Sequence, residues 1–359
     1  DGWTALMLAA QNGHEPCLRV LLEAGAVVSA QDNAGWTALM WAAQDGHEQV
    51  AHVLLEAGAA VNAQNNDGRT ALMVAAQDGH NQVALVLLEA GAAVDQTMED
   101  GWTALMFAAQ DGHEQVALVL LESGAAVNAQ DNDGFAALMI AAQYGHEQVV
   151  LVLLEAKADP NKAASDGVTA LMLAAQKGHE QVAHVLLKAG AAVDQTMEDG
   201  WTALMFAAEN GHEQVALALL EAKADPNKAQ PDGVTALMWA ASNGHEQVAL
   251  VLLEAGASLK VVSIDNFTML MAASLGGLTT VLERVLPQSD IDAAVIPSHA
   301  TEACYTALMY AAEAGQQHCV HMLLSAGARK EVQTATGKTA LSLARDSGHT
   351  AICDLLGTL

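Results

Sequence analysis

The segment AGAAVDQTMEDGWTALMFAA, residues 90–109, occurs again letter for letter at residues 189–208. The offset of 99 residues is three times a shorter period of 33 residues, which runs through the whole chain. Its marker is the glycine of the pattern G-x-T-A-L-M and its close variants, found at Gly2, Gly35, Gly68, Gly101, Gly134, Gly167, Gly200 and Gly233. The last three periods have Asn266, Cys304 and Gly337 at this position, with five extra residues before Cys304. A fixed period of this length predicts a repeat architecture.

Each period predicts two short helices. Thr4 is a suitable N-cap for a first helix over residues 5–11. A second helix begins at the next His–Glu pair, and in the first period we predict its buried residues at Val20, Leu21 and Leu22. Two helices of this length do not enclose a core, so neighbouring periods must stack and share one.

The pattern D-x-x-G-x-T-x-L-x-x-A-A-x-x-G-H, followed by V-x-x-L-L-x-x-G-A, resembles the ankyrin repeat and covers the chain in about eleven units. The resemblance implies an all-α ankyrin-repeat solenoid of 33-residue helix-turn-helix units joined by β-hairpin-like turns. The family's T-P-L-H is T-A-L-M here in most units. Ten of the fourteen methionines therefore share one column, where we expect them to fill the core.

Nine histidines follow the loop glycine of their units. Equivalent atoms of adjacent units lie about 10 Å apart, whereas zinc needs several ligands at about 2 Å, so this row does not chelate a metal. The resemblance implies that these histidines are structural and join neighbouring loops. His318, Cys319 and His321 lie closer together, but no second ligand pair accompanies them.

We predict one continuous solenoid in three stretches. Residues 1–286 hold regular repeats 1–9, the first of them truncated at its N-terminus, so that upstream sequence is expected. Residues 287–305 form a longer irregular turn, either a structural insertion or a partner contact. Residues 306–359 hold repeats 10 and 11, and the polar residues of the last unit suit a C-terminal cap.

The chain is strongly acidic, with a formal net charge of −28. Residues 1–156 contain only Arg19 and Arg69 as cations against 20 acidic residues, a balance of −18. Such a surface repels phosphate and disfavours nucleic acid and anionic membranes as partners. No apolar run approaches the roughly 20 residues that span a bilayer, so no direct membrane insertion is expected. Four sparse cysteines predict a reducing, cytoplasmic compartment.

Every aromatic residue falls at one of three positions that the family's fold places on the concave inner surface. The turn position directly follows the repeat glycine, the helix position comes five residues later, and the row position four residues after that. Aromatic side chains on such a surface are typical anchors for a peptide or protein. The predicted partner-binding residues are Trp36, Trp41, Asp45, Asp78, Trp102, Phe107, Asp111, Phe135, Tyr144, Trp201, Phe206 and Trp239.

The three aspartates of this set occupy the row position in three consecutive units. Carboxylates about 10 Å apart attract an extended segment that carries Lys or Arg and hold it beside the rings. Lys177 interrupts the row in the sixth unit, so repeats two to five are the strongest candidate groove. Two alternatives are that the rings stabilise the stack by packing on neighbouring turns, and that the aspartates form a solvated edge.

These patterns predict a non-catalytic protein–protein interaction module that binds an extended, basic and apolar segment and needs no cofactor or metal. No Gly-rich phosphate loop, nucleophile elbow or Cys–His pair with an orienting group is present. One alternative is a scaffold subunit docked into a larger assembly through its convex or flat side. Another is the accessory binding region of a larger multidomain protein.

Overall fold

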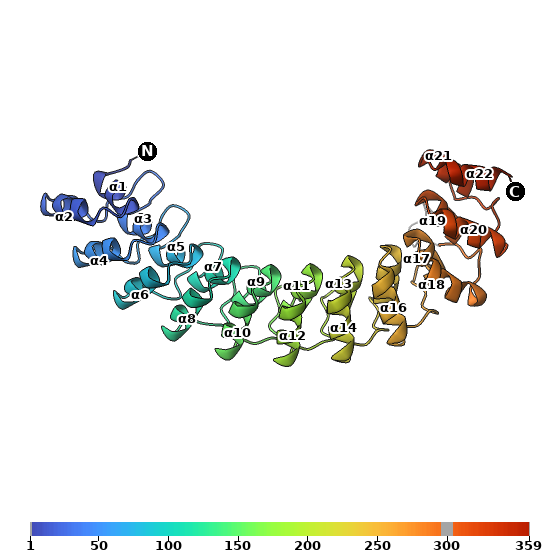
Figure 1. Ribbon diagram of the computed structural model, residues 1–359, viewed down its shortest axis with the longest axis horizontal. Helices are drawn as coiled ribbons and strands as arrows, with labels where there is room; N and C mark the ends of the chain where they lie inside the picture. Colours follow the sequence, from blue (N-terminus) through green and yellow to red (C-terminus); the bar gives the residue numbers. More distant parts are fainter. Residues whose placement is uncertain (1, 296–303, 359) are drawn as a thin grey trace. The chain divides into compact units, whose positions relative to one another are not determined.

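The computed structural model describes residues 2–295 and 304–358 (Figure 1). These residues form 22 α-helices and one short 3₁₀ helix, η1 (Leu286–Gln288). The described residues contain no strand, and their turns close with isolated antiparallel bridges such as that between Gln31 and Thr37. The predicted all-α class, with paired helices in about eleven repeats, is confirmed.

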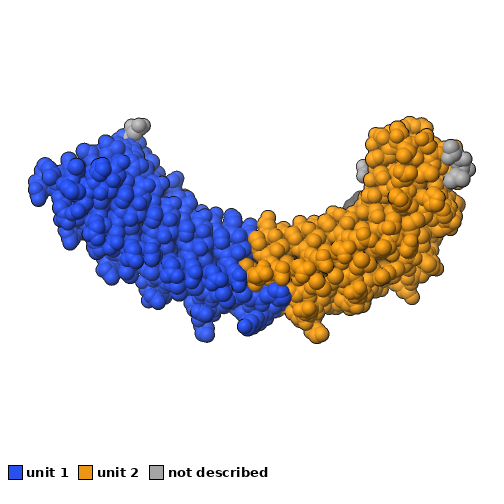
Figure 2. Space-filling view, viewed as in Figure 1, with its two compact units in different colours: residues 1–174, 184–191 blue, residues 175–183, 192–359 orange. Residues whose placement is uncertain are grey.

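The chain divides into two compact units, residues 1–174 with 184–191 and residues 175–183 with 192–359 (Figure 2). The helices of the first unit are α1 (Ala5–Gln11), α2 (Glu15–Glu23), α3 (Ala38–Gln44), α4 (Glu48–Glu56), α5 (Ala71–Gln77), α6 (Asn81–Glu89), α7 (Ala104–Asp111), α8 (Glu114–Glu122), α9 (Ala137–Tyr144) and α10 (Glu147–Glu155). Those of the second are α13 (Ala203–Asn210), α14 (Glu213–Glu221), α15 (Ala236–Ser242), α16 (Glu246–Glu254), α17 (Met269–Gly276), α18 (Thr279–Val285), α19 (Ala307–Glu313), α20 (Gln317–Ser325), α21 (Ala340–Asp346) and α22 (Thr350–Thr358). Helices α11 (Ala170–Lys177) and α12 (Glu180–Lys188) contribute residues to both units.

Within each unit the helices form two rows. The odd-numbered helices pack on one another in one row, the even-numbered helices in a second, and each odd helix packs on the even helix that follows it (Figure 1). The core lies between the rows. We call the surface made by the odd-numbered helices and the turns before them the front face, and the even-numbered helices the back row.

Most first helices begin at a threonine cap. Thr37, in extended conformation, precedes α3, and its Oγ1 accepts a hydrogen bond of 3.3 Å from the backbone N–H of Met40. The same bond starts most of the odd-numbered helices, as the T-A-L-M pattern predicts. In the fifth repeat Ala136 replaces the threonine and cannot provide this cap.

The methionine column packs in the core, as predicted. The ten methionines are each at most 1% exposed, beside alanines such as Ala42 and Ala43 that are fully buried and let the helices approach closely. The predicted burial of the second helix is wrong in the first repeat, where Leu18 is buried but Val20 is 63% exposed. The equivalent Val53 is 5% exposed because α2 of the preceding repeat packs on α4.

Histidines that follow a loop glycine join neighbouring repeats, as predicted. The His113 ring nitrogen Nε2 lies 2.8 Å from the carbonyl oxygen of Gln77, in the preceding repeat. Gly79 has a φ of +78°, and a Cβ there would lie 2.6 Å from the His113 ring, so this loop needs glycine. The same bond to the preceding repeat is made by His47, His80, His146, His212, His245 and His349.

Two lysines occupy a backbone conformation that favours glycine. Lys157 and Lys223 follow α10 and α14 with φ values of +70° and +72°, at a position that is Gly in most other repeats. An L-residue pays roughly 1–2 kcal/mol in the left-handed region. We expect the double variant Lys157→Gly, Lys223→Gly to be more stable by about 1 kcal/mol, since glycine's greater freedom in the unfolded chain offsets part of the gain.

Urea unfolding of wild type and variant measures this difference. Lys188→Gly is the matched control, because Lys188 is the last residue of α12 and lies in helical conformation, where glycine destabilises by about 1 kcal/mol. A double variant that is as destabilised as this control would refute the strain at the two positions.

The longer turn predicted over residues 287–305 lies partly outside the described residues. Its described part contains most of η1, and its residue Ala294 forms an antiparallel bridge with Thr306, just after the turn. Asp292 forms an ion pair of 2.8 Å with Arg329, in the turn after α20. This contact links the turn to the following repeat.

Candidate partner-binding face

The aromatic residues of the turn and helix positions form contacts within their own repeats. Because the turn residue precedes the helix residue by five positions, its ring folds back over the first turn of the helix. The ring centroids are 4.6 Å apart for Trp36–Trp41, 5.0 Å for Trp102–Phe107, 4.7 Å for Trp201–Phe206 and 5.2 Å for Tyr305–Tyr310.

The turn residue also packs on the helix residue of the next repeat. The centroid distances are 4.4 Å for Trp3–Trp41, 4.8 Å for Trp201–Trp239 and 5.5 Å for Phe267–Tyr310. In the third repeat Arg69 occupies the turn position, and its guanidinium lies over the Phe107 ring, 5.1 Å from the centroid. A cation therefore takes the place that a ring has in other repeats, in cation–π geometry.

Exposure separates the predicted aromatic residues into groups. Phe107 is 4% exposed, so its ring is packed beneath the front face and is not available for contact with a partner. Tyr144 is 49% exposed, and its ring stacks on His146 at 6.4 Å. The remaining aromatic residues of the predicted site are half-buried: Trp36, Trp41, Trp102, Phe135, Trp201, Phe206 and Trp239. Packing on neighbouring repeats, the alternative stated for these rings, thus accounts for part of the set.

The three aspartates lie at equivalent helix ends on the front face. Asp45 and Asp78 are the C-caps of α3 and α5, and Asp111 is the last residue of α7. All three are exposed. Tyr144 ends α9 at the same position of the following repeat, and Gln110 Nε2 donates a 3.5 Å hydrogen bond to its hydroxyl. We call Asp45, Asp78 and Asp111 the acidic row; Tyr144 continues it.

The carboxylates of the acidic row interact with one another, and no ion pair neutralises them within the described residues. The pKa of the Asp78 carboxyl is raised, chiefly by partial burial and further by the Asp111 and Asp45 carboxylates, while His80 and His113 act in the opposite direction. No ion pair joins these carboxylates to a cation in the described part of the chain.

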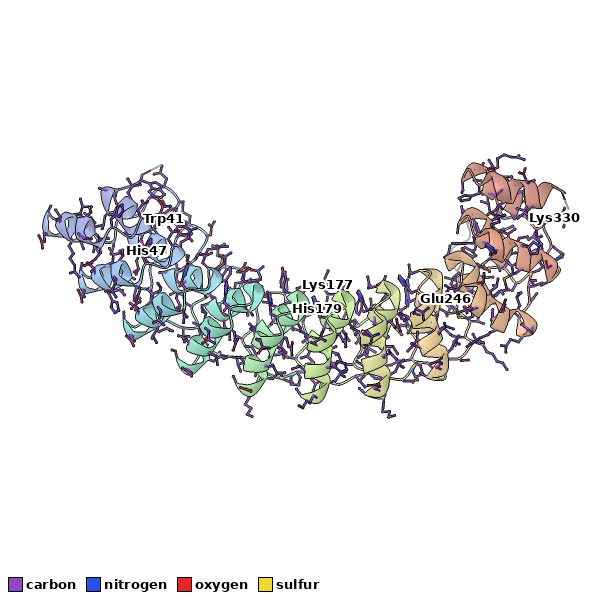
Figure 3. All side chains as sticks on the ribbon, viewed as in Figure 1. Trp41, His47, Lys177, His179, Glu246 and Lys330 are labelled. Atoms are coloured by element: carbon purple, nitrogen blue, oxygen red, sulfur yellow. The ribbon has the colours of Figure 1, made fainter. Side chains whose placement is uncertain are left out.

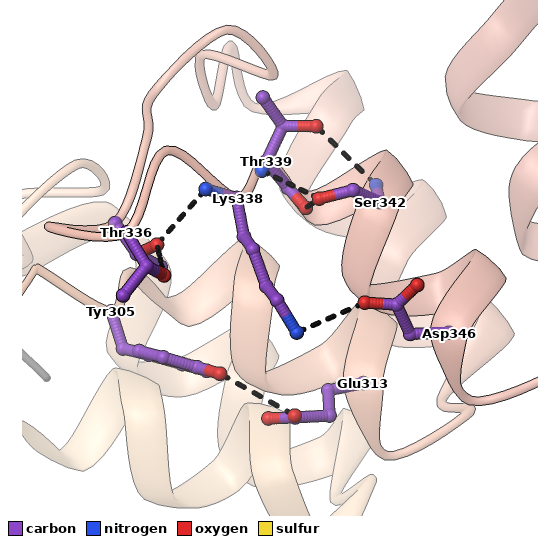
Figure 4. A network of polar contacts seen from close by, with 8 residues as sticks. Tyr305, Glu313, Thr336, Lys338, Thr339, Ser342 and Asp346 are labelled. Atoms are coloured by element: carbon purple, nitrogen blue, oxygen red, sulfur yellow. Dashed lines mark hydrogen bonds and ion pairs between the residues drawn. The ribbon is translucent and has the colours of Figure 1, made fainter.

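A further regularity was not predicted from the sequence. In three repeats the polar group of the turn residue contacts the side chain eight positions later, at the end of the first helix. Arg69 Nη1 donates a 2.7 Å hydrogen bond to Gln77 Oε1. The last two repeats repeat this geometry, with Tyr305 hydroxyl to Glu313 at 3.4 Å and Lys338 Nζ to Asp346 at 3.0 Å (Figure 4). For Arg69 and Lys338 the signal in the sequence was a basic residue at a turn position that is aromatic in most other repeats.

A shallow pocket opens among the first two repeats. Its volume is about 340 Å³. Trp41 lies on α3 (Figure 3). Its ring contacts the rings of both Trp3 and Trp36. We call this the tryptophan pocket; its lining consists of Trp3, Asp32, Asn33, Ala34, Trp36 and Trp41.

The structure brings no metal-ligand cluster together in residues 2–295 and 304–358. On α20, Cys319 is buried while His318 and His321 are exposed, so the three side chains do not converge. Burial raises the pKa of the Cys319 thiol to about 11, which keeps it protonated at neutral pH. Among the described helices none is both long and apolar enough to cross a membrane.

Comparison with known families shows which family the chain belongs to. The model for ankyrin repeats (three copies) matches in overlapping segments over residues 1–65, 28–98, 58–131, 93–164, 138–230, 223–295 and 270–358. The chain therefore belongs to the ankyrin-repeat family. Ankyrin repeats are generally protein–protein interaction modules and are typically non-catalytic. A search of curated proteins found no match.

Proposed function

We propose that the front face of repeats two to five binds an extended segment of a partner protein that carries basic and apolar residues. The acidic row is the observation that carries this proposal. Its carboxylates follow one another in adjacent repeats and form no ion pair with a cation of the described chain. The pKa of the central Asp78 is raised chiefly by partial burial and further by the Asp111 and Asp45 carboxylates, while His80 and His113 lower it. A basic segment laid along the row relieves this repulsion.

The apolar part of the proposed segment meets the half-buried rings beside the row. Trp102 covers Phe107, and Tyr144 presents an exposed ring directly after the last aspartate. Amphipathic rings held by packing supply contact area at little cost in conformational entropy. The acidic row then favours basic residues and the rings bury apolar ones, so the front face recognises both features of one segment.

Photo-cross-linking from single positions tests the proposed face. A photoreactive amino acid replaces Tyr144 on the front face in one protein and Leu85, 39% exposed on α6 of the back row, in another. The proposal predicts a defined covalent adduct from position 144. An adduct from position 85 instead favours a scaffold that docks through its back row.

A further inference from the structure

We propose that the tryptophan pocket receives an arginine side chain of the partner segment. This inference rests on the proposed function, and it adds the identity of one recognised residue and the groups that select it. The pocket belongs to repeats one and two, next to the first aspartate of the acidic row. Two observations support the arginine, the charge around the pocket and a guanidinium bound in the same way elsewhere on the face, and an unpaired donor of Trp41 suits a backbone carbonyl of the same segment.

The unpaired donor is a buried indole N–H without an acceptor. Trp41 Nε1 is shielded from solvent and has no hydrogen-bond partner among the described residues. The equivalent Trp239 donates a 2.9 Å hydrogen bond from Nε1 to Gln230 Oε1. Position 32 corresponds to 230, but Asp32 is one methylene shorter and is held in its own turn. An unpaired buried donor costs roughly 1–3 kcal/mol, which a backbone carbonyl of the entering segment recovers; the guanidinium itself only donates.

A second such donor lies in the next repeat. Asn65 Oδ1 accepts hydrogen bonds from the backbone N–H groups of Asp67 and Arg69, at 3.0 and 2.8 Å. Its Nδ2 is buried and unpaired. Within the described residues these two side-chain atoms are the only buried ones without a partner, and both belong to the front face of repeats two and three. The backbone carbonyl groups of an extended segment are suitable acceptors for both.

The charge at the pocket favours a cation. Asp32 Oδ1 accepts 2.9 Å hydrogen bonds from the backbone N–H groups of Ala34 and Trp36. Its other oxygen has no hydrogen bond or ion pair in the described residues and remains available to a guanidinium. Residues 1–156 carry a balance of −18, with only Arg19 and Arg69 as Lys or Arg residues.

The second observation is that the face already holds one guanidinium. Arg69 lies over the Phe107 ring and bonds to Gln77 at the end of α5. A planar guanidinium stacks on a ring and still donates hydrogen bonds at its edge, which an ammonium group does less well. The tryptophan pocket combines indole rings with the carboxylate of Asp32, so it offers the same two interactions to an arginine from outside.

Indole N–H resonances of the full chain report binding at this pocket. The probe is the capped tripeptide acetyl-Gly-Arg-Gly-amide, with lysine and citrulline peptides for comparison. We expect the arginine peptide to shift the Trp41 resonance saturably and to bind at least about tenfold more tightly than the uncharged citrulline peptide, a difference of about 1.4 kcal/mol. We expect the lysine peptide to bind with intermediate affinity. Equal binding of arginine and citrulline peptides, or no saturable shift of Trp41, overturns the proposal.

A turn graft supplies the matched variant. Asp32→Gln with Ala34→Asp places the residue types of Gln230 and Asp232 in the turn of repeat two, offers Trp41 an internal acceptor and leaves the net charge unchanged. Because repeat eight folds with Gln and Asp at these two positions, a folded protein is expected, and thermal unfolding checks it. The graft should weaken arginine-peptide binding at least about tenfold. Unchanged binding overturns the proposal, and Trp36→Leu, which removes one ring of the pocket, must weaken binding in parallel.

The same measurements separate this inference from the proposed function. If the arginine peptide fails to bind at Trp41 while photo-cross-linking from position 144 still captures a partner, the arginine subsite is wrong and the front-face function stands. If position 144 gives no adduct, the proposed function fails, whatever the tripeptide does.

Discussion

Reversing the acidic row in the variant Asp45→Lys, Asp78→Lys, Asp111→Lys will weaken partner binding about 100-fold or more. Each substitution replaces an attraction to the basic segment by a repulsion, and like charges facing each other across an interface cost several kcal/mol in sum. A loss of about 2.8 kcal/mol corresponds to 100-fold in the dissociation constant. Titration calorimetry with the captured partner measures it, and added salt should weaken the wild-type complex as well.

The back row offers a control of identical charge. Glu56, Glu89 and Glu122 are exposed at the ends of α4, α6 and α8, in the same three repeats. Changing all three to Lys alters the net charge by the same amount on the other side of the stack. We expect binding within about threefold of wild type. If this control loses as much affinity as the row variant, net charge and not the front face governs binding.

Truncating one core leucine will have the largest effect on stability. Leu87 of α6 is fully buried between repeats, and Leu87→Ala should lower the free energy of unfolding by about 2–5 kcal/mol. Leu85, on the same helix, is 39% exposed, so Leu85→Ala should cost less than about 1 kcal/mol. Urea unfolding followed by circular dichroism measures both variants.

The local contacts of a repeat array add a second expectation for Leu87→Ala. Each repeat contacts only its neighbours, so a weakened interface near α6 should reduce the cooperativity of unfolding and lower the apparent denaturant slope. Equal losses for the two leucine variants would mean that the shared core does not lie where the two helix rows place it.

The fold could be predicted from sequence because one pattern recurs in every repeat. The column of Met106 is apolar in almost every unit and the column of Thr103 can cap a helix in most, so each inference was supported many times over. Val20 shows the limit of this reasoning. Val20 has the same position in the repeat pattern as Val53, which is buried because a preceding repeat packs against its helix. In the described chain no repeat precedes α2, and Val20 is exposed.

The site could be predicted only at the level of columns. The predicted residues lie on the odd-numbered helices and the turns before them, but the sequence did not reveal that a turn residue covers the helix ring of the following repeat, which buries Phe107 beneath Arg69. The sequence also did not reveal that the indole N–H of Trp41 lacks an acceptor. Whether an indole finds an acceptor depends on one methylene, the difference between Asp32 and Gln230, and on which backbone groups already hold the carboxylate.

The most direct measurement is the yield of cross-linked partner from positions 144 and 85, compared side by side in otherwise identical proteins. Recognition through the front face predicts an adduct from position 144 that disappears when the acidic row is reversed, and none from position 85. An adduct from position 85 alone, unaffected by reversal of the row, would contradict it.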